Sequence, residues 1–238
     1  MPAFRVIKYQ GAIFTPDLSI SNSLAILKVI MDLLGEKLQG DPMILPIPQD
    51  APAEIPRMQF TSQDKKWILT MSLARTDLIF FDPSTLEPDG MDVEEFSGLC
   101  SAFFANLKEK LNIRVQRLAF VTDRASRNDQ ASDLIVKKFC RDELAQDGKP
   151  FNSVNNFEIH SLKTYDWKGY SLNSWVRIKA SDVRIKEEVI PALVVQNDLN
   201  TLPLDKDPGK DFSPEEIRTF FREIPAHLLD ILKKYGFE

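Results

Sequence analysis

The residues best suited to chemistry in this chain form a polar run, 122–129, that follows a predicted strand. Asp123, Arg124 and Arg127 are its charged members of interest, because two arginines beside a helix start can hold an anion. Loops at strand ends also often carry function. We therefore take these three residues as the candidate binding site for a phosphorylated or acidic small molecule. The simpler alternative is that the run caps the following helix and that its arginines are solvated or paired.

A second candidate is an aromatic and basic run in the C-terminal half. Aromatic rings with interleaved cations can stack on the bases of a single-stranded nucleic acid. The same residues also suit a half-buried hairpin whose rings pack across strands. The formal net charge of −5 favours the hairpin and makes a nucleic-acid partner unlikely. The members of this run are Tyr165, Trp167, Lys168, Tyr170, Trp175, Arg177 and Lys179.

No known catalytic or metal-binding pattern is present in the sequence. There is no HExxH, CxxC, GxSxG or Walker sequence, and the two histidines, His160 and His227, have no cysteine or carboxylate at ligand spacing. Adjacent acidic pairs such as Glu94-Glu95 do not face each other on a helix, which argues against an acid/base pair. We therefore predict no catalytic residue, no metal and no cofactor.

Bulk composition indicates an ordinary globular protein. Among the 238 residues, 43% are hydrophobic and 27% are charged. No apolar run approaches the roughly 20 residues that span a bilayer, and no signal peptide is recognisable. Cys100 and Cys140 fall on apolar helix faces, as expected of buried free thiols in a reducing cytoplasm.

Residues 56–124 carry the clearest structural pattern. Alternating apolar residues predict a hairpin from 57–61 and 67–73, followed by a strand at 77–81. Apolar spacings of three and four then predict a helix from Asp92 to Leu111, and a strand follows from Ile113 to Val121.

The remaining elements follow from the same periodicities. The first helix is expected to bury a stripe of Leu24, Leu27, Met31, Leu34 and Leu38. The proline-rich segment 42–56 suits an extended sheet edge or a partner contact. Ser213, Pro214 and Glu216 form a capping-box signal for the last helix. The other predicted elements are a strand at 4–14, helices at 21–38 and 130–144, strands at 157–164, 172–180 and 189–196, and a last helix ending at Gly236.

The order of elements predicts an α+β fold, with a mostly antiparallel sheet and four main helices packed on one face. Strand, helix, strands and helix occur in residues 1–112 and nearly recur in residues 113–238. We expect these two halves to be a pseudo-repeat that joins its sheets into one compact unit. No residue-level identity relates the halves, so the duplication is a hypothesis about topology.

The stretch that contains Pro56-Arg57, Phe60, the 67–73 strand, the Glu95-Phe96 helix entry and the 113–122 strand resembles a family of bacterial proteins. That family is sporadically distributed and functionally uncharacterised. The resemblance covers most of the chain by pattern and departs from the family at Leu118–Thr122, where members often show an Arg-Tyr-x-Asn-like sequence. It implies no activity, so no functional residue follows from it.

These observations favour a binding or regulatory protein of a prokaryote or its mobile elements. An antitoxin-, immunity- or defence-accessory-like protein with a protein partner is the leading hypothesis. The alternatives are an enzyme that acts on an acidic small molecule at Asp123, Arg124 and Arg127, and a single-stranded nucleic-acid binder. The composition is equally compatible with a monomer and a homodimer.

Overall fold

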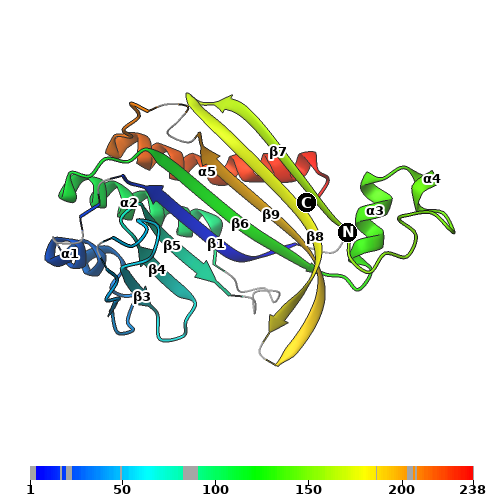
Figure 1. Cartoon of the computed structure of the whole chain (residues 1–238), viewed down its shortest axis with the longest axis horizontal. Helices are drawn as coiled ribbons and strands as arrows, with labels where there is room; N and C mark the ends of the chain where they lie inside the picture. Colours follow the sequence, from blue (N-terminus) through cyan, green and yellow to red (C-terminus); the bar gives the residue numbers. More distant parts are fainter. Residues whose placement is uncertain are drawn as a thin grey trace.

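The computed structural model describes residues 4–16, 18–19, 23–48, 50–82, 91–185, 187–202, 206 and 208–237. Its described strands form one nine-stranded antiparallel sheet in the order β2-β3-β4-β5-β1-β6-β9-β8-β7 (Figure 1). The strands are β1 (Arg5–Phe14), β2 (Met43–Ile44), β3 (Met58–Thr61), β4 (Trp67–Met71), β5 (Arg75–Phe81), β6 (Arg117–Arg127), β7 (Glu158–Trp167), β8 (Tyr170–Ile185) and β9 (Glu188–Thr201). The α+β fold with an antiparallel sheet is confirmed.

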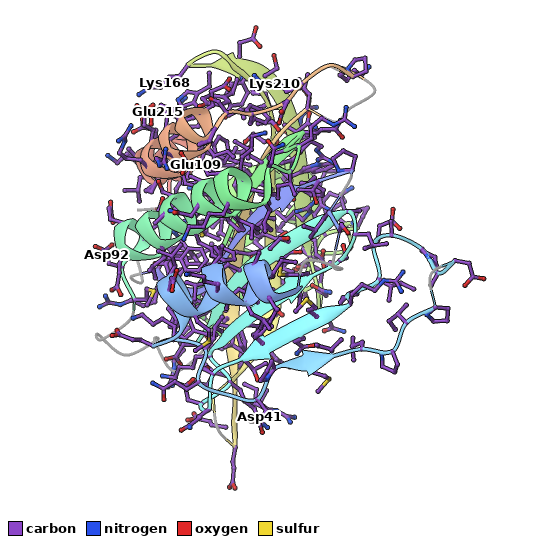
Figure 2. All side chains as sticks on the ribbon, turned by 90° about the vertical axis from the view of Figure 1, so that its left-hand side faces the viewer. Asp41, Asp92, Glu109, Lys168, Lys210 and Glu215 are labelled. Carbon is purple, nitrogen blue, oxygen red and sulfur yellow. The ribbon has the colours of Figure 1, made fainter. Side chains whose placement is uncertain are left out.

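Three helices cover one face of the sheet. They are α1 (Ser23–Leu34), α2 (Val93–Leu111) and α5 (Pro214–Lys234), and they lie side by side in one layer (Figure 2). Arg218 of α5 reaches Glu109 of α2 at 3.1 Å. The short helices α3 (Ala131–Phe139) and α4 (Asp142–Ala145) lie at the end of the sheet instead (Figure 1).

Aromatic rings fill the space between the helices and the sheet. Phe96 of α2 packs on Phe120 of β6 with centroids 5.8 Å apart, and Phe104 packs on Phe221 of α5 at 5.2 Å. All four side chains are fully buried. Helix α2 approaches β1 closely at Gly11, where a Cβ atom would collide with the sulfur of Cys100. The absence of a side chain at residue 11 therefore sets the distance between sheet and helix.

The start of the last helix is confirmed, and α2 begins at Val93, one residue after its predicted start. Asp92 caps α2 through the backbone N–H of Glu94, and Ser213 and Glu216 form the expected capping box of α5. Pro225 lies inside α5, which runs through it without interruption. Of the proline-rich segment, Met43–Ile44 forms the edge strand β2, while the predicted first residues of the opening helix lie outside the described residues.

The strand order relates the predicted halves in a simple way. Strands β1 and β6 pair at the middle of the sheet. From there the order β1-β5-β4-β3 on one side matches β6-β9-β8-β7 on the other. This is the arrangement that two similar halves would produce, and their duplication stays a prediction.

Three local predictions were wrong. The polar run 122–129 is mostly strand, because β6 extends to Arg127 and pairs with β1 and β9 on both sides. The strand predicted from Ile113 begins only at Arg117. The helix predicted at 130–144 breaks after Phe139, where Cys140 is extended, and none of the residues of α4 is buried.

The apolar stripe predicted for the first helix is correct only in part, because Leu34 and Leu38 are buried but two of its other members are not. Leu24 and Met31 are 81% and 60% exposed, whereas Ile26, Val29 and Ile30 are completely buried. Apolar residues surround most of this helix, so the sequence pattern did not decide which side would contact the sheet.

Candidate functional site

The face of the sheet opposite helices α1, α2 and α5, here called the open face, carries two networks of polar side chains. Alternation along each strand places every second residue on it. Asp123 of β6 lies opposite Gln196 of β9, which lies opposite Arg177 of β8, and Arg177 lies opposite His160 of β7. These four side chains thus form one row across four strands.

Hydrogen bonds connect this row. Arg177 donates from Nη1 to Oε1 of Gln196 at 2.6 Å, and Gln196 donates from Nε2 to Oδ1 of Asp123 at 2.7 Å. The Arg177 guanidinium also lies over the ring of Trp175 at 4.9 Å and within 3.5 Å of Asp198. The network orients a cation and a carboxylate on a surface that no described helix covers.

A second polar group lies on the open face near the middle of the sheet. Arg75 and Gln10 both donate to Oδ1 of Asp77, at 2.6 and 2.8 Å. The guanidiniums of Arg75 and Arg117 lie 4.7 and 4.5 Å from the ring centre of Phe14. Cation and ring contacts of this kind hold both arginines in place.

A cavity of about 590 Å³ opens on the same face beside the first row. Buried apolar side chains of Ile7, Val183 and Val194 line it, and they belong to a small cluster separate from the main core. Its polar lining includes Asp123, His160, Arg177, Lys179 and Gln196. Apolar walls with a few fixed polar groups are the usual composition of a small-molecule site.

The structure separates the three residues predicted as a site. Asp123 lies on the open face and lines this cavity. The next residue, Arg124, points to the helix side, where its side chain is only 4% exposed. Arg127 ends β6 on the surface, 3.9 Å from Glu188. Consecutive strand residues face opposite sides, so Asp123 and Arg124 do not converge on one ligand.

Arg124 is an unusual buried cation. Its Nη1 donates to Oγ1 of Thr122 at 2.7 Å and to Oδ1 of Asn197 at 3.2 Å. No carboxylate among the described residues forms an ion pair with it. Burial lowers the pKa of the guanidinium, and the nearby phenol of Tyr9 partly opposes that effect.

The aromatic hairpin divides between the two faces of the sheet. Trp167 stacks on His227 of α5 at 4.6 Å, and Tyr165 makes a 2.7 Å hydrogen bond to the same imidazole. Tyr170 donates to the backbone carbonyl of Glu216. These three rings therefore anchor α5, whereas Trp175 and Arg177 lie on the open face.

A buried arginine contributes to holding the proline-rich segment against the protein. Arg57 is 7% exposed, and its guanidinium donates to the carbonyls of Pro48 and Ala51 at 2.7 and 3.1 Å. Met43 and Ile44 remain exposed at this edge of the sheet.

Of the cysteines, Cys100 is buried and Cys140 is half-buried, and both are free thiols.

The described residues contain no group of three or more histidine, cysteine, aspartate or glutamate side chains placed to hold a metal ion. None of the described helices is both long and apolar enough to cross a membrane.

Gln196, Asp198 and Asp77 belong to these polar networks but carry no sequence motif that predicts a site. Gln196 and Asp198 flank Asn197, which is polar and completely buried, and Asp77 follows the buried Thr76, so no alternation of polar and apolar residues marks these positions as a solvated sheet face. Their association depends on the strand order, which connects residues 73 positions apart, as in the Gln196–Asp123 contact.

No protein-family model and no curated protein sequence matches this chain. Among solved structures, a rolling circle replication initiator protein from Geobacillus stearothermophilus is similar with a TM-score of 0.31 and 10% identity. The similarity covers 97% of this chain and 85% of that protein. A TM-score this low does not establish a shared fold, so nothing about this protein follows from it. The resemblance to a bacterial family stays a prediction.

Proposed function

We propose that this protein is a binding or regulatory protein that holds a protein partner on the open face of its sheet. The observation that carries the proposal is the combination of a sheet face that no described helix covers with a prearranged polar network. The row Arg177–Gln196–Asp123 is held by hydrogen bonds in the free protein. Side chains that are already ordered lose little entropy on binding, which favours recognition.

Apolar groups accompany this network. Leu162 of β7 is 49% exposed and lies opposite Trp175, and Phe81 at the end of β5 is 44% exposed. Exposed apolar side chains surrounded by polar groups are typical of interaction surfaces. An antitoxin-like, immunity-like or defence-accessory-like role in a prokaryote is the specific form of the proposal suggested by the sequence.

The test is native mass spectrometry of the tagged protein recovered gently from its own host. We expect a protein partner to accompany the wild-type chain and to be lost from the Leu162→Glu variant. The matched control is Leu229→Glu, which changes another exposed leucine, 41% exposed, on helix α5. Repeated recovery of the bare wild-type chain, or loss of the partner only with Leu229→Glu, would contradict the proposal.

A second candidate function is supported by the cavity beside Asp123. Arg177 and Lys179 line it and could pair with a small acidic molecule, and an enzyme acting on such a molecule would use this cavity rather than Arg124 or Arg127. Titration with inorganic phosphate tests this candidate. Stabilisation of the wild type but not of Lys179→Met would favour it, and equal responses of the two proteins would exclude it.

A further inference from the structure

Strand β8 has an unpaired edge beyond the start of β7. The pairing of β7 with β8 ends at Glu158 and Lys179, whereas the pairing of β8 with β9 continues to Ile185 and Glu188. Among the described strands, the residues of β8 after Lys179 are therefore paired on one side only.

Pro191 shows which backbone groups of this edge are free. It lies opposite Asp182 and has no N–H, and its carbonyl accepts a 3.0 Å hydrogen bond from Asn128 on the other side of β9. The backbone N–H and C=O of Asp182 consequently point away from β9, and alternation directs those of Arg184 the same way. Within the described part of the chain, neither residue has a backbone partner on that side.

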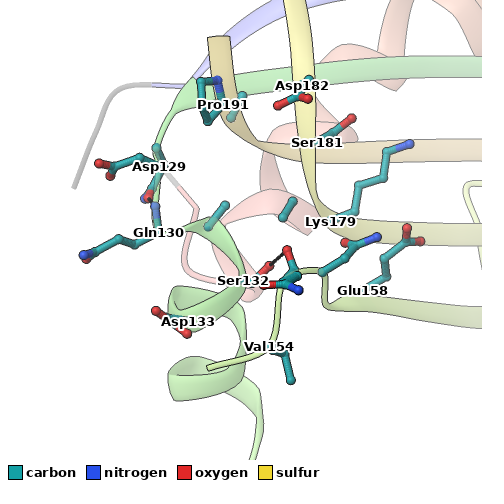
Figure 3. A pocket seen from close by; sticks show the side chains of 16 residues that line it. Asp129, Gln130, Ser132, Asp133, Val154, Glu158, Lys179, Ser181, Asp182 and Pro191 are labelled. Atoms are coloured by element: carbon teal, nitrogen blue, oxygen red, sulfur yellow. Dashed lines mark hydrogen bonds between the residues drawn. The ribbon is translucent and has the colours of Figure 1, made fainter. Parts of the chain in front are cut away.

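A cavity of about 570 Å³ lies along this edge (Figure 3). Residues 179–182 of β8 form one wall, and the start of α3 with residues 154–156 forms the other. The segment 154–156 is attached to α3 by Ser132, whose hydroxyl donates to the carbonyl of Asn155. The unpaired edge of β8 thus forms one wall of a groove, and it is not the fully exposed edge of a β-hairpin.

The groove is acidic. Its lining contains the carboxylates of Asp129, Asp133, Glu158 and Asp182 but only one amine, that of Lys179. Glu158 is paired with His160 at 3.1 Å. The other three carboxylates make no hydrogen bond or ion pair with any described side chain, so they are free to attract a cationic group.

We propose that an extended, lysine- or arginine-bearing segment of a protein partner adds to the β8 edge in this groove, in line with β7. This inference rests on the proposed function, since it names the chemistry of part of the protein partner. A row of outward backbone donors and acceptors is satisfied by another extended peptide and not by a helix. The free carboxylates select a basic segment and repel a nucleic acid.

The experiment is a phage-display selection of random peptides against the full-length protein. The peptides have about eight residues, because at about 3.3 Å per residue this length spans the edge. The N–H of residue 182 points away from β9, so Asp182→Pro removes this N–H without removing a hydrogen bond to β9. Proline is tolerated at such edge positions. Asp182→Asn is the matched control, since it removes the charge and keeps the N–H. Thermal melting of both variants verifies that they fold.

We expect the selected peptides to be rich in lysine or arginine and in β-branched residues. Loss of the hydrogen bond together with the clash of the proline ring should weaken their binding to Asp182→Pro by about tenfold, against about threefold for Asp182→Asn. Amide exchange at Asp182 and Arg184 should slow when a selected peptide binds to the wild type. That measurement serves as the test if Asp182→Pro fails to fold.

Several results would overturn the inference: no selected peptide, selected peptides without a basic bias, unchanged binding to Asp182→Pro, or unchanged exchange at the two amides. A dimer that Asp182→Pro converts to monomer would also overturn it, because a second copy would then occupy the edge. If the host partner is lost with Leu162→Glu but kept with Asp182→Pro, the proposed function stands and this inference fails. If no partner is recovered from the host, the proposed function fails first.

Discussion

Asp123 and Arg124 are adjacent in sequence, yet their side chains lie on opposite faces of the central strand β6. Asp123 accepts a hydrogen bond from Gln196 on the open face, whereas Arg124 is buried beneath the helices against Thr122 and Asn197. The guanidinium of Arg124, which the sequence predicts to lie in a binding loop, is therefore part of the core. Its burial has consequences for stability that can be measured.

Replacing Arg124 by methionine should change the free energy of unfolding little, by about 1 kcal/mol or less, or increase it. Methionine fills similar space without the cost of burying a charge that lacks a carboxylate partner. Thr122 and Asn197 lie directly opposite each other, so they can re-form a hydrogen bond between themselves. Arg124→Ala is the comparison, and its cavity should cost about 2–4 kcal/mol. Urea unfolding gives both values, and a loss above about 3 kcal/mol for Arg124→Met would show that the charge itself stabilises the fold.

The stability of this protein should fall as the pH drops below the ordinary histidine pKa of about 6.5. Burial lowers the pKa of His227, and Lys234 and Lys168 lower it further, while Asp230 raises it. A folded pKa below the unfolded one means that the stabilisation is present above pH 6.5 and is lost as the pH falls through the folded pKa.

Urea midpoints at neutral and mildly acidic pH measure this effect. The His227→Leu variant should lose the pH dependence in that window. His160→Gln, which changes the other histidine of the chain, should retain it. An identical pH response of wild type and His227→Leu would contradict the prediction.

Alanine at residue 11 should destabilise the protein by about 1–3 kcal/mol, because its Cβ atom would overlap the sulfur of Cys100 and crowd Phe104. Cys100→Ala should relieve the overlap, so the double variant should lose less than the sum of the single variants. A double-mutant cycle from thermal or urea unfolding measures this coupling, and additive losses would show that the two residues do not meet.

Gly98, on helix α2, is the opposite case to Gly11 on strand β1. A Cβ atom at residue 98 would meet no heavy atom within 4 Å. Gly98→Ala should therefore stabilise the protein by about 1 kcal/mol through helix propensity alone. A destabilised Gly98→Ala variant would indicate that this exposed side of α2 contacts something in solution, and a concentration series of the unfolding midpoint would detect self-association.

The capping box should contribute about 1 kcal/mol to stability. Ser213 accepts a hydrogen bond from the backbone N–H of Glu216, whose carboxylate accepts one from the N–H of Ser213. Ser213→Ala should lose this amount in urea unfolding, whereas Ser213→Thr, which keeps a hydroxyl that accepts from the N–H of Glu216 and donates to its carboxylate, should lose much less. Equal losses in the two variants would show that α5 is held by packing alone.

The sequence by itself determined those helices and strands whose capping residues and apolar periodicity agree with the contacts that they make in the folded protein. Helix α2, with its capping aspartate and periodic phenylalanines, and helix α5, with its capping box, lie where the pattern predicts them. The 57–73 hairpin and the edge position of Met43–Ile44 also followed from alternation and from proline placement. The two helix caps join residues no more than three positions apart, and the hairpin and the edge strand join neighbouring stretches of the chain, so local sequence patterns are sufficient to predict them.

Tertiary structure alone decided the rest. The polar run 122–129 became the end of a central strand because β1 and β9 supply hydrogen-bond partners on both sides, which outweighs its loop-like composition. Which side of α1 is buried, and the union of Arg177, Gln196 and Asp123 into one row, depend on contacts between distant parts of the chain. Local sequence sets propensities, but strand order decides which side chains share a face, and the candidate site is made of such shared faces.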